Sequence, residues 1–177
     1  MPIESGRHTF GPENATLTVE TKRTGAASKA GHDLVIEVTS WAAALDVADD
    51  PAITLTADAG SLRVREGRGG IQALGDDDKA GIEQTIDEEV LKGTAIEFRS
   101  SAVELSPDGM RGKVHGELEL AGSRRPISGE LFAGEDGRLT ARATVKQSDW
   151  GMKPYSALFG TLKVADEVEV AIEARLI

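Results

Sequence analysis

The chain has 177 residues, no cysteine and a formal net charge of −10. Its length fits one domain with a core large enough to fold without disulfides, so we expect a single domain over residues 1–177. The lack of cysteine excludes a disulfide, a thiolate metal site and a cysteine nucleophile. The acidic balance disfavours nucleic acid and anionic membrane surfaces as partners.

The N-terminal residues contain no basic segment followed by an apolar run, which is the pattern of a secretory signal. No stretch approaches the roughly 18 consecutive apolar residues that a membrane-spanning helix needs. The sequence therefore predicts a soluble, cytoplasmic protein without an integral membrane segment. It leaves the oligomeric state open, a homodimer included.

The first part of the chain alternates apolar and polar residues, the pattern of strands with one buried and one solvated face. Residues 14–22 form one such run. Residues 34–47 and 53–64 form two longer runs, and each changes parity once, near Ser40 and near Gly60. A change of parity within a run predicts a bulge or bend, which lets a long strand curl around the corner of a barrel.

Residues 76–91 are predicted to form a helix. Ile82, Ile86 and Val90 recur every four residues and fall on one helical face. The run begins with three aspartates, whose charge is favourable at a helix N-terminus, and Gly93 is well placed to end it.

The remaining sequence returns to alternation, with short turns between the runs, which predicts an antiparallel meander. The chain contains only four Phe, two Trp and one Tyr, so the apolar face consists mostly of Ala, Val, Leu and Ile. Small side chains on the inner face of a barrel are compatible with a void, and the residues alone leave open whether the barrel is hollow or filled. The predicted strands are residues 96–105, 114–120, 127–131, 139–145, 158–164 and 168–176.

The sequence contains no strong catalytic, cofactor or metal motif. The glycine-rich residues 67–75 precede a helix, but its opening aspartates would repel a phosphate. His8, His32 and His115 lack metal-ligand spacing, so we expect neither a metal nor a cofactor.

An enzyme that uses His32 or Asp149 is one hypothesis. His32 and Asp33 are adjacent, and adjacent residues of a strand point to opposite faces, so this pair is unsuited to act together. No nucleophile elbow accompanies Ser148 and Asp149. A structural histidine at a strand end is the simpler interpretation of His32.

Several segments from Ala57 to Ile177 follow one another in a specific order and spacing. They are Ala59–Leu62, Asp76–Phe98, Glu97–Ser101, the hairpin Gly116–Ile127, the corner Ser148–Gly151, and Gly160 with the closing strand Val164–Ile177. Together these segments resemble the YceI-like family of lipocalin-like, polyisoprenoid-binding proteins. One departure is Gln147, which stands where the family pattern has arginine. The resemblance implies an all-β fold: an extended antiparallel lipocalin-like β-barrel of about eight strands with one flanking α-helix, holding a long isoprenoid chain.

We therefore predict a non-catalytic protein whose partner is an apolar small molecule, an isoprenoid or another lipid, held inside the barrel. Two alternatives remain: a structural or interaction barrel with a filled core, and the enzyme described above. The side chains predicted to line the barrel are Leu34, Ile36, Trp41, Phe98, Leu118, Trp150, Leu158 and Phe159. For Trp150 a plug at a barrel corner is an equally good interpretation.

Overall fold

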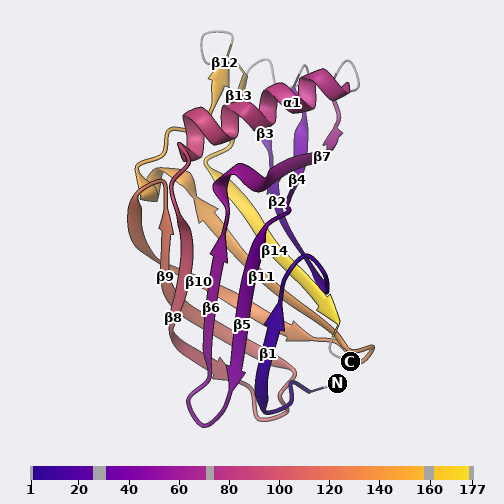
Figure 1. Cartoon of the computed structure of the whole chain (residues 1–177), viewed down its shortest axis with the longest axis vertical. Coiled ribbons are helices and arrows are strands. Elements are labelled where there is room, and N and C mark those ends of the chain that lie inside the picture. Colours follow the sequence, from indigo (N-terminus) through magenta and orange to yellow (C-terminus); the bar gives the residue numbers. More distant parts are fainter. Residues whose placement is uncertain (1, 26–30, 71–73, 158–161, 176–177) are drawn as a thin grey trace.

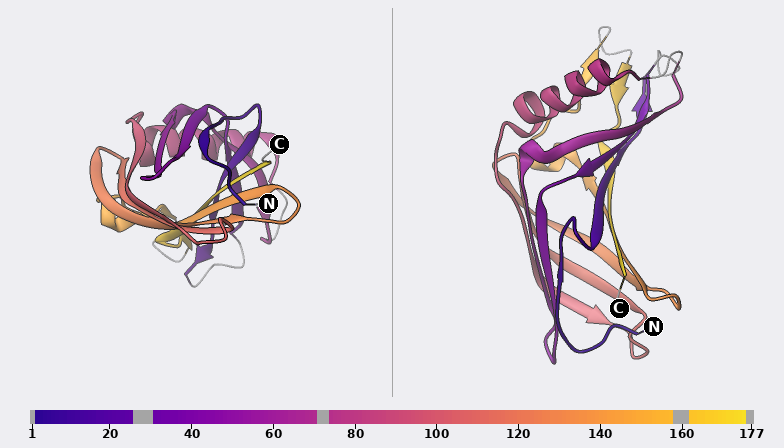
Figure 2. Two further views of the ribbon diagram at one scale, coloured as in Figure 1. Left: turned by 90° about the horizontal axis from the view of Figure 1, so that it is seen from below. Right: turned by 45° about the vertical axis from the view of Figure 1, so that its right-hand side comes forward.

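The computed structural model describes residues 2–25, 31–70, 74–157 and 162–175. Most of the described strands join one eleven-stranded sheet that curls around on itself (Figures 1 and 2). All of its pairings are antiparallel. In sheet order the strands are β1 Gly6–Phe10, β5 Trp41–Val47, β6 Ala52–Ala57, β8 Ile96–Leu105, β9 Arg111–Leu120, β10 Ser123–Ala133, β11 Arg138–Lys146, β14 Glu167–Arg175, β2 Ala15–Thr21, β4 Asp33–Val38 and β7 Leu62–Arg68.

A small second sheet lies at the end of the molecule that α1 crosses (Figure 1). It is formed by β12 Ser156–Ala157, β13 Leu162–Val164 and β3 Arg23–Thr24, in that order. The two chain termini lie at the opposite end (Figure 1).

The predicted all-β class with one flanking helix is confirmed, but the expected barrel of about eight strands is wrong in two respects. The large sheet has eleven strands. It is also a curled half-barrel, because its order runs from β1 to β7 and no pairing within the described ranges joins these two edges. The strand count rises partly because two predicted long strands are each divided at their bends.

These two bends lie side by side and form a hydrogen-bonded corner. β4 ends and β5 begins around Ser40, and β6 is separated from β7 by the short 3-10 turn η2, Ala59–Ser61. The Thr39 amide donates to the Ser61 carbonyl at 2.9 Å, and the Asp58 amide donates to the Ser40 carbonyl at 3.0 Å. Because β5 and β6 lie near one edge of the sheet and β4 and β7 at the other, this corner ties the two edges together.

The helix predicted over residues 76–91 is confirmed as α1 Asp76–Thr85, which continues as the π-helical segment η3 Ile86–Leu91. The Asp78 side chain caps its start by accepting from the Gly75 amide at 3.0 Å. The Glu83 carboxylate accepts from the Val64 amide of β7 at 2.9 Å. The helix therefore pairs one N–H group of the edge strand β7 and packs beside this edge, which limits its exposure as a template for another strand.

Gly116 in β9 allows a close approach of β8 on the inner face of the sheet. Gly116 is opposite Ser100, next to an irregularity in the β8–β9 register. A Cβ atom at this position would lie within 3.0 Å of the Arg99 carbonyl oxygen and of the Phe98 ring. The Phe98 ring therefore covers the glycine, a packing that needs a residue without a side chain.

We expect Gly116→Ala to lower the free energy of unfolding by about 1–3 kcal/mol, the usual cost of forcing an extra methyl into a packed site. Urea denaturation would measure the loss. Gly81→Ala in α1 is the matched control, since a Cβ there meets no atom within 4 Å. It should be neutral or stabilising by up to about 1 kcal/mol. Equal free energies of unfolding for the two variants would show that the close approach at Gly116 does not contribute to stability.

Candidate functional site

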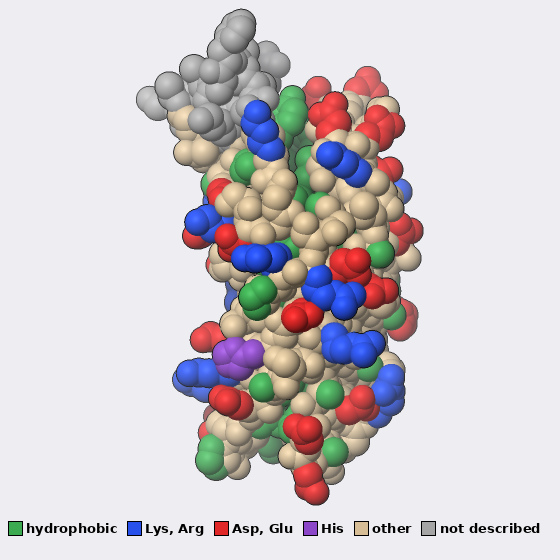
Figure 3. Space-filling view, turned by 90° about the vertical axis from the view of Figure 1, so that its left-hand side faces the viewer, with side chains coloured by type: hydrophobic (Ala, Val, Ile, Leu, Met, Phe, Trp, Pro, Cys, Tyr) green, Lys and Arg blue, Asp and Glu red, His purple; other side chains and the backbone are tan. Residues whose placement is uncertain are grey.

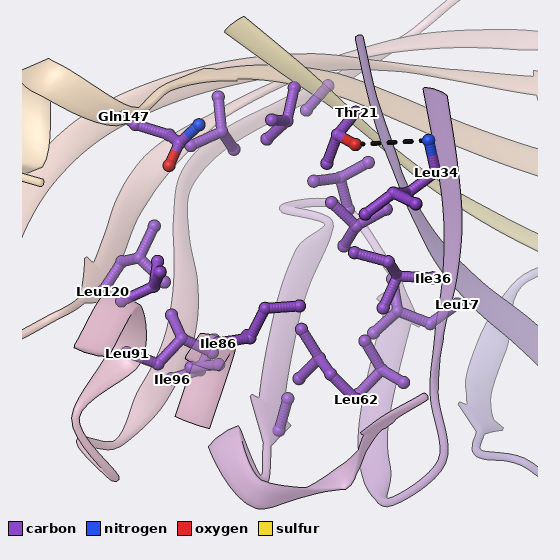
Figure 4. A pocket seen from close by; sticks show the side chains of 18 of the residues that line it. Leu17, Thr21, Leu34, Ile36, Leu62, Ile86, Leu91, Ile96, Leu120 and Gln147 are labelled. Carbon is purple, nitrogen blue, oxygen red and sulfur yellow. Dashed lines mark hydrogen bonds between the residues drawn. The ribbon is translucent and has the colours of Figure 1, made fainter. Parts of the chain in front are cut away.

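A cavity of about 790 Å³ lies inside the curled sheet, beneath the helix. Its wall is formed by inward-facing side chains from both halves of the large sheet and from α1 and η3 (Figure 4). Leu17 and Ile36 contribute from β2 and β4, Leu120 from β9, and Ile86 and Leu91 from the helix. The wall is therefore predominantly apolar.

The cavity exists because the inner face of the sheet carries many small residues. Ala43, Ala57, Ala141 and Ala143 line it, and Gly129 adds no side chain at all. Side chains of this size cannot reach across the space between opposite walls, and close packing would require larger ones. The sequence composition was compatible with a void of this kind and had left a filled core open as the alternative.

A packed core cluster borders the cavity toward the end where the termini lie. The buried side chains of Ile3, Leu45, Ala133 and Leu139 form a separate core cluster. The Ile3 amide donates to the Gly109 carbonyl at 2.9 Å, which fixes the N-terminal segment across this end. An occupant of the cavity therefore cannot enter through this cluster without displacing it.

Polar residues line the other end, next to the start of α1 and the small sheet. Arg23, His32, Asp77, Asp78 and Tyr155 all contribute to the cavity wall. The Arg23 guanidinium donates from Nη1 to two backbone carbonyls, of residue 31 at 3.0 Å and of residue 68 at 2.9 Å. This bridge holds the glycine-rich β7 end against the strand that begins after residue 31.

Two of the lining residues are polar and buried, and the sequence analysis missed both. Thr21 is 8% exposed and Gln147 is 7% exposed. A signal for each was present, since Thr21 continues the inward parity of Leu17 and Val19, and Gln147 continues that of Val145. A polar residue at an inward position of an otherwise apolar strand face marks a group that needs a partner inside.

Gln147 is held by a tight corner, the 3-10 turn η4 Gln147–Trp150. The backbone amide of Gln147 donates to the Asp166 carbonyl at 2.9 Å, and the backbone amide of Ser148 donates to the Asp166 carboxylate at 2.8 Å. Trp150 is buried and donates from Nε1 to the Leu118 carbonyl at 2.8 Å. Gly151 ends the turn with a left-handed φ of 73°. This corner therefore positions Gln147 rather than presenting reactive groups.

The predicted lining residues divide into three groups. Leu34, Ile36, Phe98 and Leu118 line the cavity. Trp41 and Trp150 are buried in the core cluster and do not line the cavity. Leu158 and Phe159 lie outside the described residues. Contact of any of these side chains with a ligand stays a prediction.

The two residues of the enzyme hypothesis have different surroundings. His32 lines the polar end of the cavity, whereas Asp149 is exposed in η4 and does not line it. Within the described ranges, no three His, Asp or Glu side chains gather as they would around a metal ion. None of the described helices combines the length and apolarity needed to cross a bilayer.

The comparison with known proteins agrees with this architecture. A model of the YceI-like domain matches residues 7–176. The chain belongs to the YceI-like family. This confirms the resemblance that the sequence segments carried, and extends it to the N-terminal strands.

Two solved structures show the same fold. BcnA from Burkholderia cenocepacia is 16% identical, with 92% of this chain and 96% of that chain covered and a TM-score of 0.63. The YCEI protein of Campylobacter jejuni is 15% identical, with 80% and 82% covered and a TM-score of 0.56. At identities of 16% and 15%, the likeness to these two structures concerns the fold alone. No curated protein is detectably similar in sequence.

The carboxylate of Asp166 gives the corner a pH dependence. Hydrogen bonds from the Ser148 hydroxyl and amide lower the pKa of Asp166 below its usual value. A lowered folded-state pKa contributes stability above the unfolded-state value of about 4, and this stability is lost as the pH falls through the folded-state pKa. We expect the stability difference between the wild type and Asp166→Asn to be greatest near neutral pH and to shrink below about pH 4.

Urea unfolding at a series of pH values would measure this difference. Ser148→Ala removes the hydroxyl hydrogen bond, which is the largest cause of the lowered pKa of Asp166. In this variant the free energy of unfolding should therefore fall less steeply as the pH drops below about 4. A difference between the wild type and Asp166→Asn that stays constant with pH would show that the ionised carboxylate does not stabilise the corner.

Proposed function

We propose that this protein binds a long apolar molecule, an isoprenoid or another lipid, inside the curled sheet and performs no chemistry on it. The observation that carries the proposal is the cavity of about 790 Å³ with its predominantly apolar wall. This volume lies in the upper part of the range of roughly 300–1,000 Å³ that is common for small-molecule sites. The family resemblance, which implies a long isoprenoid chain inside the barrel, supports the same class of ligand.

The binding energy would come from desolvation of the chain. Each methylene group moved from water into an apolar site contributes about 0.8 kcal/mol. The wall supplies the matching surface, for example at Leu17, Ile36 and Ile86. The apolar core cluster at one end and the polar lining residues at the other favour an orientation in which the apolar chain points toward the termini and a polar group stays near the helix.

The molecular surface supports an internal site. On the face in Figure 3, acidic and basic side chains are interspersed, and apolar ones are scattered rather than gathered into one large patch. Such a face offers an apolar ligand no continuous surface. The filled-core alternative fits less well, because a packed interior leaves few voids larger than a water molecule. For the enzyme alternative, which uses His32 or Asp149, His32 lines the cavity and Asp149 does not.

Filling the cavity tests the proposal. Ala143 faces the cavity, and its neighbour Thr144 lies on the exposed outer face of β11. We expect Ala143→Phe to weaken binding of the fluorescent hydrocarbon diphenylhexatriene by about tenfold or more, because the ring occupies space that the ligand needs. Fluorescence titration of protein freed of lipid would measure the affinity.

Thr144→Phe is the matched control, since it adds the same ring one residue away on the opposite face. It should bind diphenylhexatriene like the wild type, and urea unfolding should show both variants folded. Equal affinity of Ala143→Phe and Thr144→Phe, or no binding by the wild type, would contradict an internal apolar site.

A further inference from the structure

Buried polar side chains are rare in this molecule, and two of them face the same cavity. Among the described residues, Thr21, Ser61 and Gln147 are the buried polar ones. Ser61 is satisfied by the backbone, since its hydroxyl bonds to the carbonyls of Asp58 and Ser40. Thr21 and Gln147 instead line the apolar cavity, on opposite sides of the view in Figure 4.

The orientation of the Gln147 amide follows from its one side-chain hydrogen bond. Its Nε2 donates to the Ala165 carbonyl at 3.2 Å. A flipped amide would place two oxygens against each other, because a carbonyl can only accept. The nitrogen is therefore fixed against Ala165, and the oxygen Oε1 receives no hydrogen bond from any described residue. Figure 4 shows the amide group on the cavity side of the wall.

Thr21 offers the complementary group. Its hydroxyl oxygen accepts from the Leu34 amide at 3.3 Å (Figure 4). A hydroxyl can donate one hydrogen bond as well as accept, and no described residue accepts from this one. Of the polar residues that line the cavity, these two are the buried ones among the described residues: Gln147 offers an acceptor and Thr21 a donor.

Leaving such groups unpaired in an apolar site is unfavourable, so an occupant that pairs with them is preferred over one that does not. Both groups are neutral. An ionised head group beside them would lose its hydration without gaining a counter-charge from either one. The arrangement fits a neutral hydroxyl, which can donate to Gln147 or accept from Thr21.

We propose that Gln147, assisted by Thr21, selects apolar ligands that carry a neutral hydroxyl group. This inference rests on the proposed binding function and adds the chemistry of the ligand's polar end. The Gln147 Oε1 atom accepts from the ligand hydroxyl, and the Thr21 hydroxyl donates to a ligand oxygen. Gln147 and Thr21 are then residues that determine specificity, and the apolar wall supplies the affinity.

The test compares two probes of equal chain length, the isoprenoid alcohol geranylgeraniol and its methyl ether. The ether keeps the oxygen but has no donor for Gln147. Each probe displaces diphenylhexatriene from lipid-free protein, and the ratio of the two affinities is the measured quantity. The wild type should prefer the alcohol by about tenfold, the effect of one additional buried hydrogen bond.

In Gln147→Leu the preference should fall to about one, chiefly through weaker binding of the alcohol. Thr85→Val is the matched control. Thr85 also lines the cavity, but its hydroxyl already donates to the Gly81 carbonyl of its own helix at 3.0 Å, so the preference should stay at the wild-type value. Thr21→Val should weaken both probes, since each has an oxygen that can accept from Thr21.

Several outcomes would overturn the inference. Equal binding of the two probes by the wild type, or an unchanged preference in Gln147→Leu, would remove the role of Gln147 while leaving an apolar binding site intact. Loss of the preference in Thr85→Val as well would show a general effect of altering the wall. Failure of both probes and of diphenylhexatriene to bind would instead remove the proposed function itself.

Discussion

The arrangement of this molecule depends on a shortage of side-chain volume on the inner face of its sheet. Gly129, Ala141 and Ala143 occupy neighbouring inward positions on β10 and β11, and Ala43 and Ala57 do so on β5 and β6. Interiors normally pack to the density of organic crystals, so a wall of this composition must either collapse or remain hollow. The backbone decides between these outcomes.

Three sets of contacts hold the walls apart. The paired bends at Ser40 and Ser61 tie the two edges of the sheet through main-chain hydrogen bonds. Glu83 of α1 fastens the helix to the edge strand β7 at the Val64 amide. At the opposite end, the cluster around Ile3 fills the space between the strands. Hydrogen-bonded strands resist inward movement, since collapse would break ladder bonds in a region without water to replace them.

The sequence predicted the features that depend on local periodicity. Alternation identified the strands, and the four-residue spacing of Ile82 and Ile86 identified the helical face that covers the cavity. The scarcity of aromatic residues was compatible with a void without deciding between a hollow and a filled interior. The parity changes near Ser40 and Gly60 also located the corner. These properties are visible because they depend on neighbours in the chain.

The remaining features could not be predicted, because they depend on contacts between segments that are distant in the sequence. Which strands form the edges depends on contacts between distant segments, so the half-barrel with eleven strands was not foreseen. Trp41 and Trp150 were predicted to line the barrel, but both side chains are packed in the core cluster. The local alternation of a strand does not show what packs against a side chain. Gln147 was noted only as a departure from the family pattern, since its position at the cavity wall follows from the η4 corner and Asp166.

The central claim is that small inner-face residues leave a dry, open space. Diffraction from crystals of lipid-free protein under xenon pressure tests it most directly, because xenon enters apolar cavities that exclude water. We predict strong xenon peaks bounded by Gly129, Ala141 and Ala143, with side-chain positions unchanged from those described. An interior filled by rearranged side chains, without xenon, would contradict the claim.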